Sequence, residues 1–220
     1  KRQQRREQMR RSEQRSRLFT IGLISLGAIL IAFVFIYPNF KSVGAIAAPE
    51  IINRPETKAN TVGDPNAPIT IQEFSDFQCP YCRVFYEKTE AQLIETYVAT
   101  GKVFFEYNSF GDFIGAESRA AAEAAYCAGD QNKFWEMHDI IFTNQTGENV
   151  GDYTDRRLKA FAEQIGLNMD EFNSCFAGGT YSDTVSQDFT DGRSYQIQAT
   201  PSFIMTYTVN GKTKTVLIEG

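Results

Sequence analysis

The sequence contains few side chains of the kinds that usually hold zinc. Its 220 residues include one histidine, His138, and four cysteines. Cys79 and Cys82 are separated by two residues, whereas Cys127 and Cys175 lie far from them and from each other. A structural zinc site needs four Cys or His ligands at suitable spacing. We therefore expect no metal ion, and no pattern in the sequence indicates another cofactor.

Charged residues are missing from positions 18–37. Twenty helical residues would span about 30 Å, which is the thickness of the hydrocarbon core of a bilayer. Residues 1–17 carry eight Lys or Arg and two Glu, and a basic flank of this kind favours a cytoplasmic N-terminus. The pattern predicts a transmembrane signal anchor over 18–37 in membrane lipid and a basic cytoplasmic segment over 1–17. Beside a membrane span this segment indicates attraction to anionic lipid, not nucleic-acid binding.

A cleaved signal peptide is the alternative to an anchor. Residues 45–47, Ala-Ile-Ala, resemble a small-residue cleavage site, and cleavage would give a secreted protein. The apolar run is longer than the roughly 7 to 15 residues usual in a signal peptide, so the anchor is favoured. Residues 38–61 mix Pro, Asn, Gly and Ala without a sustained period. They predict a tether between the membrane and a folded domain outside the cytoplasm.

Cys79 and Cys82 lie where a strand-like segment passes into a helical one. Residues 69–77 are rich in β-branched and aromatic side chains, and residues 83–98 have helical periodicity. Two thiols with a two-residue spacer at a helix start can form and break a disulfide, so the pattern predicts a redox site. A purely structural disulfide is the alternative, but so short a loop would constrain the unfolded chain little.

Cys79 is the expected nucleophile of this pair, and Cys82 is the expected resolving thiol. At a helix N-terminus the macrodipole and the unpaired backbone N–H groups favour the thiolate, which can lower a cysteine pKa from about 8.5 to roughly 3.5 to 7.5. Pro80 suits the first helical position because its missing N–H would have had no intrahelical partner. Four cysteines in an exported domain are typical of an oxidising compartment.

The remaining elements follow from periodicity and turn signals. Residues 102–110 predict a second strand, parallel to the first because a helix connects them. A helical region follows, and the dipeptide Asn210-Gly211 predicts a hairpin turn between two final strands. The expected helices are 117–128, 133–142, 155–165, 169–176 and 182–196, and the hairpin strands are 202–209 and 212–218.

Three motifs in this order resemble those of the DsbA-like thiol–disulfide oxidoreductases of the thioredoxin superfamily. They occupy residues 63–68, 73–82 and 199–203, and the resemblance covers residues 62–220. It implies an α/β thioredoxin fold with a helical insertion at about 115–197, here preceded by the single N-terminal transmembrane helix. The family usually adds a final helix, so we expect the chain to be truncated at its C-terminus, and the missing initial methionine suggests the same for its N-terminus.

The resemblance also implies roles around the dithiol. In the family the proline of the last motif is cis and faces the active disulfide, so Pro201 and Thr200 would shape a substrate groove together with Pro80 and Tyr81. Glu73 stands where relatives carry a buried acid that moves the proton of the second cysteine. Burial would raise its pKa and suit it to that role. A solvated strand carboxylate is the other interpretation of Glu73.

Cys127 and Cys175 both fall in the helical insertion, as a second disulfide does in several relatives. The resemblance implies a structural disulfide, which for a loop of this size could stabilise the fold by about 4 kcal/mol. A relay that passes electrons to the active pair is the alternative. His138 also lies in the insertion, and the family motif gives it no catalytic role.

The resemblance implies an extracytoplasmic enzyme that introduces disulfides into exported polypeptides with free thiols. A quinone-linked membrane partner of the DsbB or vitamin K epoxide reductase type would reoxidise it. A disulfide isomerase or reductase of DsbG-like type is the first alternative, because Pro-Tyr between the cysteines and Thr200 before the proline also occur there. A non-catalytic thioredoxin-like chaperone or binding module is the second alternative.

Overall fold

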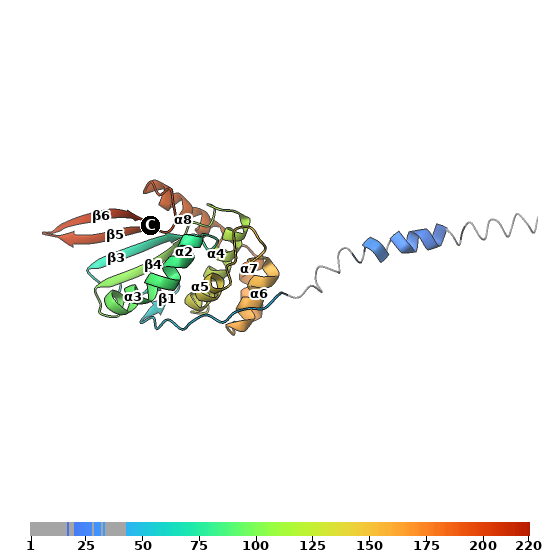
Figure 1. Cartoon of the computed structure of the whole chain (residues 1–220), viewed down its shortest axis with the longest axis horizontal. Helices are drawn as coiled ribbons and strands as arrows, with labels where there is room; N and C mark the ends of the chain where they lie inside the picture. The colour runs from blue at the N-terminus through green and yellow to red at the C-terminus, as the bar shows by residue number, and fades with distance from the viewer. Residues whose placement is uncertain (1–16, 18–19, 28, 32, 34–42) are drawn as a thin grey trace, which may run out of the picture. The chain divides into compact units, whose positions relative to one another are not determined.

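The structure of the protein is a computed structural model, shown in Figure 1. The chain divides into two compact units, residues 1–44 and residues 45–220. The described residues are 17, 20–27, 29–31, 33 and 43–220.

In the first unit, the described residues of the predicted anchor 18–37 are helical. The other anchor residues, most of the predicted cytoplasmic segment and the start of the predicted tether lie outside the described residues. Within the described part of the chain, no helix combines the length and the hydropathy required to cross a membrane. The residues outside the description are 1–16, 18–19, 28, 32 and 34–42.

The second unit is built on a six-stranded sheet with the order β1-β2-β4-β3-β5-β6. The central strands β3 and β4 are parallel, and every other neighbouring pair is antiparallel. Figure 1 shows the hairpin β5–β6 beside β3 and the helices beside the sheet. The strands are β1 (Thr57–Lys58), β2 (Thr61–Val62), β3 (Ile69–Ser75), β4 (Val103–Ser109), β5 (Ser202–Val209) and β6 (Lys212–Glu219).

The two faces of the sheet are covered by different helices. Because successive side chains of a strand point to opposite faces, Phe105 of β4 joins the main core while Phe74 of β3 joins a smaller core with Phe110. Helix α8 (Ser182–Ser194) packs on the smaller core. A Cβ at Gly192 of α8 would lie 2.7 Å from Cε2 of Phe110, so this glycine allows the helix to lie close to the sheet.

A continuous helical segment follows the dithiol. It comprises α2 (Pro80–Phe85), η1 (Tyr86–Glu90), α3 (Ala91–Leu93) and η2 (Ile94–Val98), of which η1 and η2 are π-helical. The sequence pattern predicts the helix but not its π-helical turns, because hydrophobic periodicity does not resolve a single extra residue in a turn. The last residue of η1, Glu90, is completely buried.

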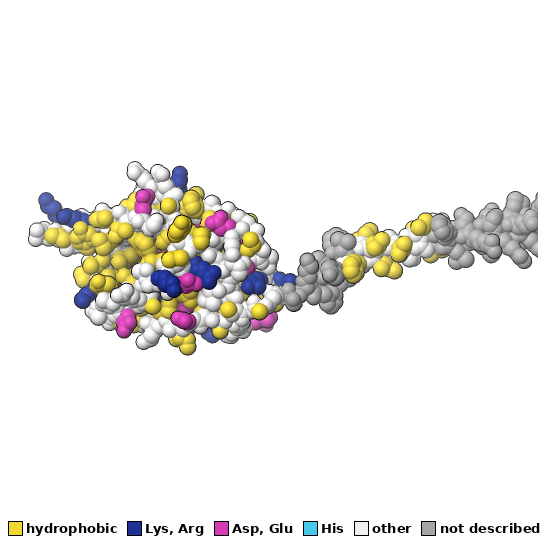
Figure 2. Space-filling view, viewed as in Figure 1, with side chains coloured by type: hydrophobic (Ala, Val, Ile, Leu, Met, Phe, Trp, Pro, Cys, Tyr) yellow, Lys and Arg dark blue, Asp and Glu magenta, His cyan; other side chains and the backbone are white. Residues whose placement is uncertain are grey.

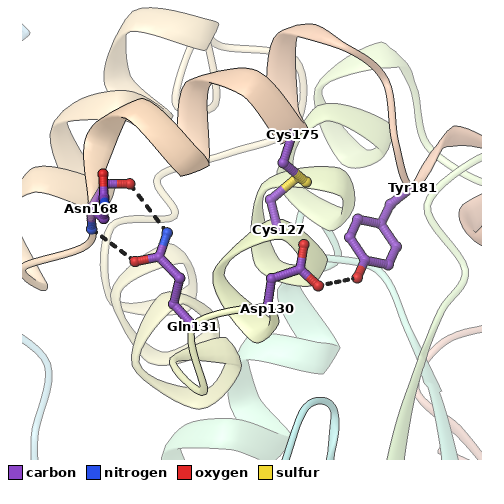
Figure 3. Close-up of a disulfide and its surroundings, with 6 residues drawn as sticks. All are labelled: Cys127, Asp130, Gln131, Asn168, Cys175 and Tyr181. Atoms are coloured by element: carbon purple, nitrogen blue, oxygen red, sulfur yellow. Dashed lines mark hydrogen bonds between the residues drawn. A yellow bond between two sulfur atoms is a disulfide. The ribbon is translucent and has the colours of Figure 1, made fainter.

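The helical insertion packs against the main core. A disulfide between Cys127 of α4 and Cys175 of α7 joins two of its helices, with an S–S distance of 1.99 Å and a Cα–Cα distance of 5.8 Å. Figure 3 shows this disulfide beside two other links between the same regions, Gln131 with Asn168 and Asp130 with Tyr181. The four helices are α4 (Ala116–Gly129), α5 (Phe134–Thr143), α6 (Asp155–Gln164) and α7 (Met169–Ala177).

The structure differs from the predicted tether over 38–61, because the C-terminal part of this segment forms β1 and the start of β2. Residues 45–56, which we call the strap, belong to the second unit and lie against the rest of it. The side chain of Asn144 exchanges two hydrogen bonds of 2.9 Å with the backbone of Ala47, and Ile46 and Ile52 pack against the main core. An extended segment held by long-range contacts has no period of its own, so the sequence pattern could not reveal it.

Candidate active site

Cys79 caps the N-terminus of α2, and Cys82 lies inside the first turn of that helix. Cys79 has extended backbone angles, φ −69° and ψ 122°, and Pro80 begins the helix. Both cysteines are free thiols in this structure. Cys79 is 6% exposed, whereas Cys82 is fully buried, and the backbone N–H of Asp76 donates to the Sγ atom of Cys82 over 3.5 Å. Only Cys79 can therefore meet another molecule without a change in the fold.

The pKa values of the two thiols shift in opposite directions. A hydrogen bond with the Cys82 thiol is the largest influence that lowers the pKa of Cys79 to about 6, and it acts against desolvation by burial. The Thr200 side chain and the backbone N–H groups of Cys82 and Tyr81 lower it further. Desolvation by burial raises the pKa of Cys82 well above its usual value, and Cys79 adds to that shift. At neutral pH the pair therefore holds one thiolate and one thiol.

The loop before β5 brings Thr200 and Pro201 to the dithiol. The Cys79 thiol donates a hydrogen bond of 3.3 Å to the carbonyl oxygen of Thr200, and the peptide bond between Thr200 and Pro201 is cis. Pro80 and Tyr81 are exposed beside them, Tyr81 by 71%. The structure thus places all four residues predicted for a substrate groove next to the Cys79 sulfur.

An apolar surface continues from the dithiol along α2 and the hairpin. The ring of Phe85 in α2 lies 4.8 Å from the ring of Phe203 in β5, and Phe203 pairs with Ile218 of β6. Val84 and Ile218 are each about half exposed. Figure 2 shows hydrophobic side chains gathered over β3, β5 and β6 in this view.

Glu73 of β3 is 1% exposed. Desolvation by burial raises its pKa well above the usual value, and the nearby Glu90 raises it further. The charge of Glu73 in turn contributes to the raised pKa of Cys82. The structure therefore buries Glu73 in the core and does not support a solvated strand carboxylate.

The family model described as Thioredoxin matches residues 56–216. The chain belongs to the thioredoxin family. The crystal structure of oxidised BdbD from Bacillus subtilis is similar, with a TM-score of 0.61 and 24% identity, over 77% of this chain and 88% of that chain. Wolbachia pipientis alpha-DsbA1 gives a TM-score of 0.64 at 22% identity, over 76% of this chain and 85% of that chain. The predicted thioredoxin-like α/β fold with a helical insertion is confirmed.

Curated relatives of this thioredoxin-family chain include two kinds of protein. The chain is 28% identical over 201 residues to the probable disulfide bond formation protein D of Bacillus cereus, covering 85% of this chain and 87% of that protein. It is 31% identical over 150 residues to Na(+)/H(+) antiporter NhaA 1 of Salinispora arenicola, covering 68% of this chain and 21% of that protein. The chain thus spans about a fifth of the length of the first curated relatives that it matches.

Asp76 is a second buried carboxyl group near the dithiol, and the sequence predicted no role for it. Its carboxylate accepts hydrogen bonds from the backbone N–H groups of Gln78 (2.8 Å) and Ile114 (3.2 Å). Desolvation by burial is the main cause that raises the pKa of Asp76 to about 6. Its position three residues before Cys79 was the available signal, because it places the side chain at the strand end that carries the dithiol.

His138 lies in the core and not at the dithiol surface. Its ring is surrounded by aromatic side chains, and Nδ1 lies 2.9 Å from Oδ1 of Asp139. Arg54 of the strap forms ion pairs of 2.7 Å with Asp139 and with Glu90. In the described part of the chain, no group of three or more His, Cys, Asp or Glu side chains is arranged to hold a metal ion.

Proposed function

We propose that the protein is a thiol–disulfide oxidoreductase that introduces disulfides into exported polypeptides. The observation that carries this proposal is the unequal dithiol, in which the pKa of Cys79 is lowered to about 6 and that of Cys82 is raised. A disulfide in which the attacked sulfur forms a stable thiolate is easily reduced, so it tends to oxidise other thiols. The adjoining apolar surface suits unfolded substrates.

The reaction begins with the oxidised Cys79–Cys82 pair. A substrate thiolate attacks Sγ of Cys79, the bond between the two enzyme sulfurs breaks, and Cys82 leaves as a thiolate that takes a proton from Glu73. A second substrate thiolate then attacks the substrate sulfur of the mixed disulfide and releases Cys79 as a thiolate. The substrate loses two electrons and gains a disulfide, and the enzyme ends as the dithiol seen in the structure. Catalytic roles therefore fall to Cys79, Cys82 and Glu73.

Turnover requires an oxidant that accepts two electrons from the reduced pair. We assign this step to a quinone-linked membrane partner of the DsbB or vitamin K epoxide reductase type. The charge-free run 18–37 behind a basic segment supports a signal anchor in the cell membrane, with the folded unit outside the cytoplasm. Secretion after signal-peptide cleavage is the alternative localisation.

Two measurements on the full chain test this function. In the first, the thiolate fraction of Cys79 is followed by iodoacetamide labelling against pH, and we expect a midpoint near 6. In the second, equilibration with glutathione gives the reduction potential. A value near roughly −120 mV supports an oxidase, whereas one near roughly −270 mV supports a reductase and would contradict the proposed direction.

A substrate assay separates catalysis from simple binding. The oxidised protein should form disulfides in a reduced, unfolded ribonuclease, and Cys79→Ser should abolish this reaction while leaving the fold intact. Scrambled ribonuclease, tested in parallel, would report isomerase activity. If the Cys79→Ser variant still increased the recovery of active ribonuclease, the protein would instead be a non-catalytic chaperone module.

A further inference from the structure

The side chain of Gln145 contacts the backbone on both sides of the Cys79 peptide unit. Its Nε2 atom donates hydrogen bonds to the carbonyl oxygens of Phe77 (2.6 Å) and Cys79 (3.1 Å). Gln145 lies two residues after Thr143, the last residue of helix α5, and it is 4% exposed. One amide from the helical insertion thus binds two carbonyl groups, one on each side of the peptide bond that joins Gln78 to Cys79.

Gln145 is itself held firmly. Its backbone N–H donates to the carbonyl oxygen of Phe142 over 3.2 Å. Its carbonyl oxygen accepts a hydrogen bond of 2.5 Å from Nη1 of Arg83 in α2. The residue therefore connects the end of α5 to the helix whose N-terminus carries the dithiol.

Neighbouring contacts fix the same stretch, and among them the backbone N–H of Arg83 also donates to the Cys79 carbonyl, over 3.2 Å. The hydroxyl group of Tyr153 donates to the carbonyl oxygen of Phe77 over 3.0 Å. The backbone N–H of Asn149 donates to Oε1 of Gln78 over 2.5 Å. Of the side chains in the described part of the chain, Gln145 is the one with a hydrogen bond to the carbonyl of Cys79.

The orientation of this backbone matters because the Cys79 thiolate depends on nearby dipoles. Backbone N–H groups of Tyr81 and Cys82 stabilise it, and a carbonyl oxygen that turned toward the sulfur would do the opposite. Each of the two carbonyl groups has one further donor, the backbone N–H of Arg83 for Cys79 (3.2 Å) and the hydroxyl group of Tyr153 for Phe77 (3.0 Å). Loss of the amide would therefore remove one of two hydrogen bonds from each carbonyl group and hold the peptide units less firmly. The titratable groups that interact with the sulfur are Cys82 and Asp76, and Tyr153 binds the carbonyl oxygen of Phe77.

We propose that Gln145 is a positioning residue of the dithiol, whose side-chain amide holds the backbone of residues 77–79 so that the Cys79 sulfur faces the N-terminus of α2 and the incoming substrate thiol. This inference rests on the proposed function, since it concerns the reactivity of the same sulfur. It also gives the helical insertion a part in the chemistry, because its α5 terminus supplies the contact.

The test compares Gln145→Met with Gln131→Met in the full chain. Methionine keeps the length of glutamine but donates no hydrogen bond. Gln131 is a matched control because its amide also joins two segments, with Nε2 donating to the carbonyl of Asn168 (3.1 Å) and Oε1 accepting from its N–H (2.8 Å), beside the disulfide in Figure 3. Thermal unfolding, iodoacetamide labelling against pH and ribonuclease oxidation are measured for each.

For Gln145→Met we expect the labelling midpoint of Cys79 to rise by about 1 pH unit, so labelling at pH 6 falls about fivefold while labelling at pH 9 is unchanged. Ribonuclease oxidation should slow in parallel. Gln131→Met should shift only thermal unfolding. Tyr153→Phe, which leaves the Gln145 contacts in place, should also keep the midpoint.

Three outcomes would overturn the inference. The first is a Gln145→Met variant with the wild-type labelling profile. The second is an equal shift in Gln131→Met, and the third is an unfolded Gln145→Met variant, which would make Gln145 a residue of the fold alone. A failure of the proposed function looks different, because the wild-type protein itself would then show neither a labelling midpoint near 6 nor ribonuclease oxidation.

Discussion

The Cys79 thiol donates a hydrogen bond to the carbonyl oxygen of Thr200, 3.3 Å away in space and 121 residues later in the sequence. This contact joins the start of α2 to the loop before β5, so the sheet that pairs β3 with β5 also sets the distance between the sulfur and the loop. The side chain of Thr200 is one of the influences that lower the pKa of Cys79. Thr200 is therefore a contact residue of the reacting sulfur.

Replacing Thr200 by valine keeps the shape of the side chain and removes its hydroxyl group. We expect the pKa of Cys79 to rise, so that iodoacetamide labelling at pH 6 falls by about two- to fivefold. Labelling at pH 9 should not change. Thr206→Val, in β5 after that loop and paired with Thr215, is the control; equal effects of the two variants would disprove a specific role for Thr200.

The ion pairs of Arg54 attach the strap to the rest of the folded unit and contribute to the free energy of unfolding. Its guanidinium group contacts the buried carboxylates of Glu90 and Asp139, and its side chain is 4% exposed. Arg54→Met would leave two buried carboxylates without their cation, and we expect a loss of about 3 to 5 kcal/mol in the free energy of unfolding. Urea denaturation measures this loss.

Two further variants distinguish charge from packing at Arg54. Adding Glu90→Gln and Asp139→Asn to Arg54→Met should recover a large part of the lost stability, because no unpaired charge remains buried. Glu87→Gln removes the half-exposed ion pair with Arg83 and should change stability by less than about 1 kcal/mol. A loss for Arg54→Met no larger than that of Glu87→Gln would contradict the structural role.

The sequence could predict those features that depend on neighbours in the chain. The β-branched and aromatic residues of the β3 segment, the Asn210-Gly211 turn and the spacing of Cys79 and Cys82 each act within a few residues. The strands, the hairpin and the dithiol were therefore predicted. A buried acid at Glu73 was implied by the family resemblance, with a solvated carboxylate as the alternative. The helix after the dithiol was also predicted, apart from its π-helical turns.

Features held together by distant segments could not be predicted in this way. The strap has no periodicity, and its fixed place depends on Asn144 and on the carboxylates that meet Arg54. The role inferred for Gln145 depends on a helix end that reaches residues 77–79 across 66 positions of the chain. The sequence predicts only a loop for a polar residue between two helices, because no neighbouring residue indicates which carbonyl groups its side chain will bind.

The disulfide between Cys127 and Cys175 should matter for stability and not for the chemistry at Cys79. Replacing both cysteines by serine removes a link between α4 and α7 that closes 48 residues. We expect the free energy of unfolding to fall by up to about 4 kcal/mol. The labelling midpoint of Cys79 and the rate of ribonuclease oxidation should remain as in the wild type below the unfolding temperature; a loss of oxidation in a folded variant would favour an electron relay.

Glu73→Gln separates the proposed proton transfer from the ionisation of Cys79. The variant keeps the size of the buried side chain but cannot give a proton to Cys82. We expect ribonuclease oxidation to slow by about 10- to 100-fold, while iodoacetamide labelling of Cys79 still proceeds. Glu106→Gln, on the opposite face of the sheet beside Gln72, is the control and should keep the wild-type rate.

Stability against pH provides an independent measurement on the same variant. Because burial raises the pKa of Glu73, the folded protein retains a proton that the unfolded chain releases above its usual pKa of about 4.5. Folding then becomes less favourable as the pH rises from that value toward the raised pKa, since the folded state binds more protons. Glutamine does not titrate, so Glu73→Gln should gain stability relative to the wild type from pH 4 to pH 8 in urea denaturation. A difference between the two proteins that stays constant over this range would show that Glu73 is not a buried acid, and its assignment as the proton donor to Cys82 would fall.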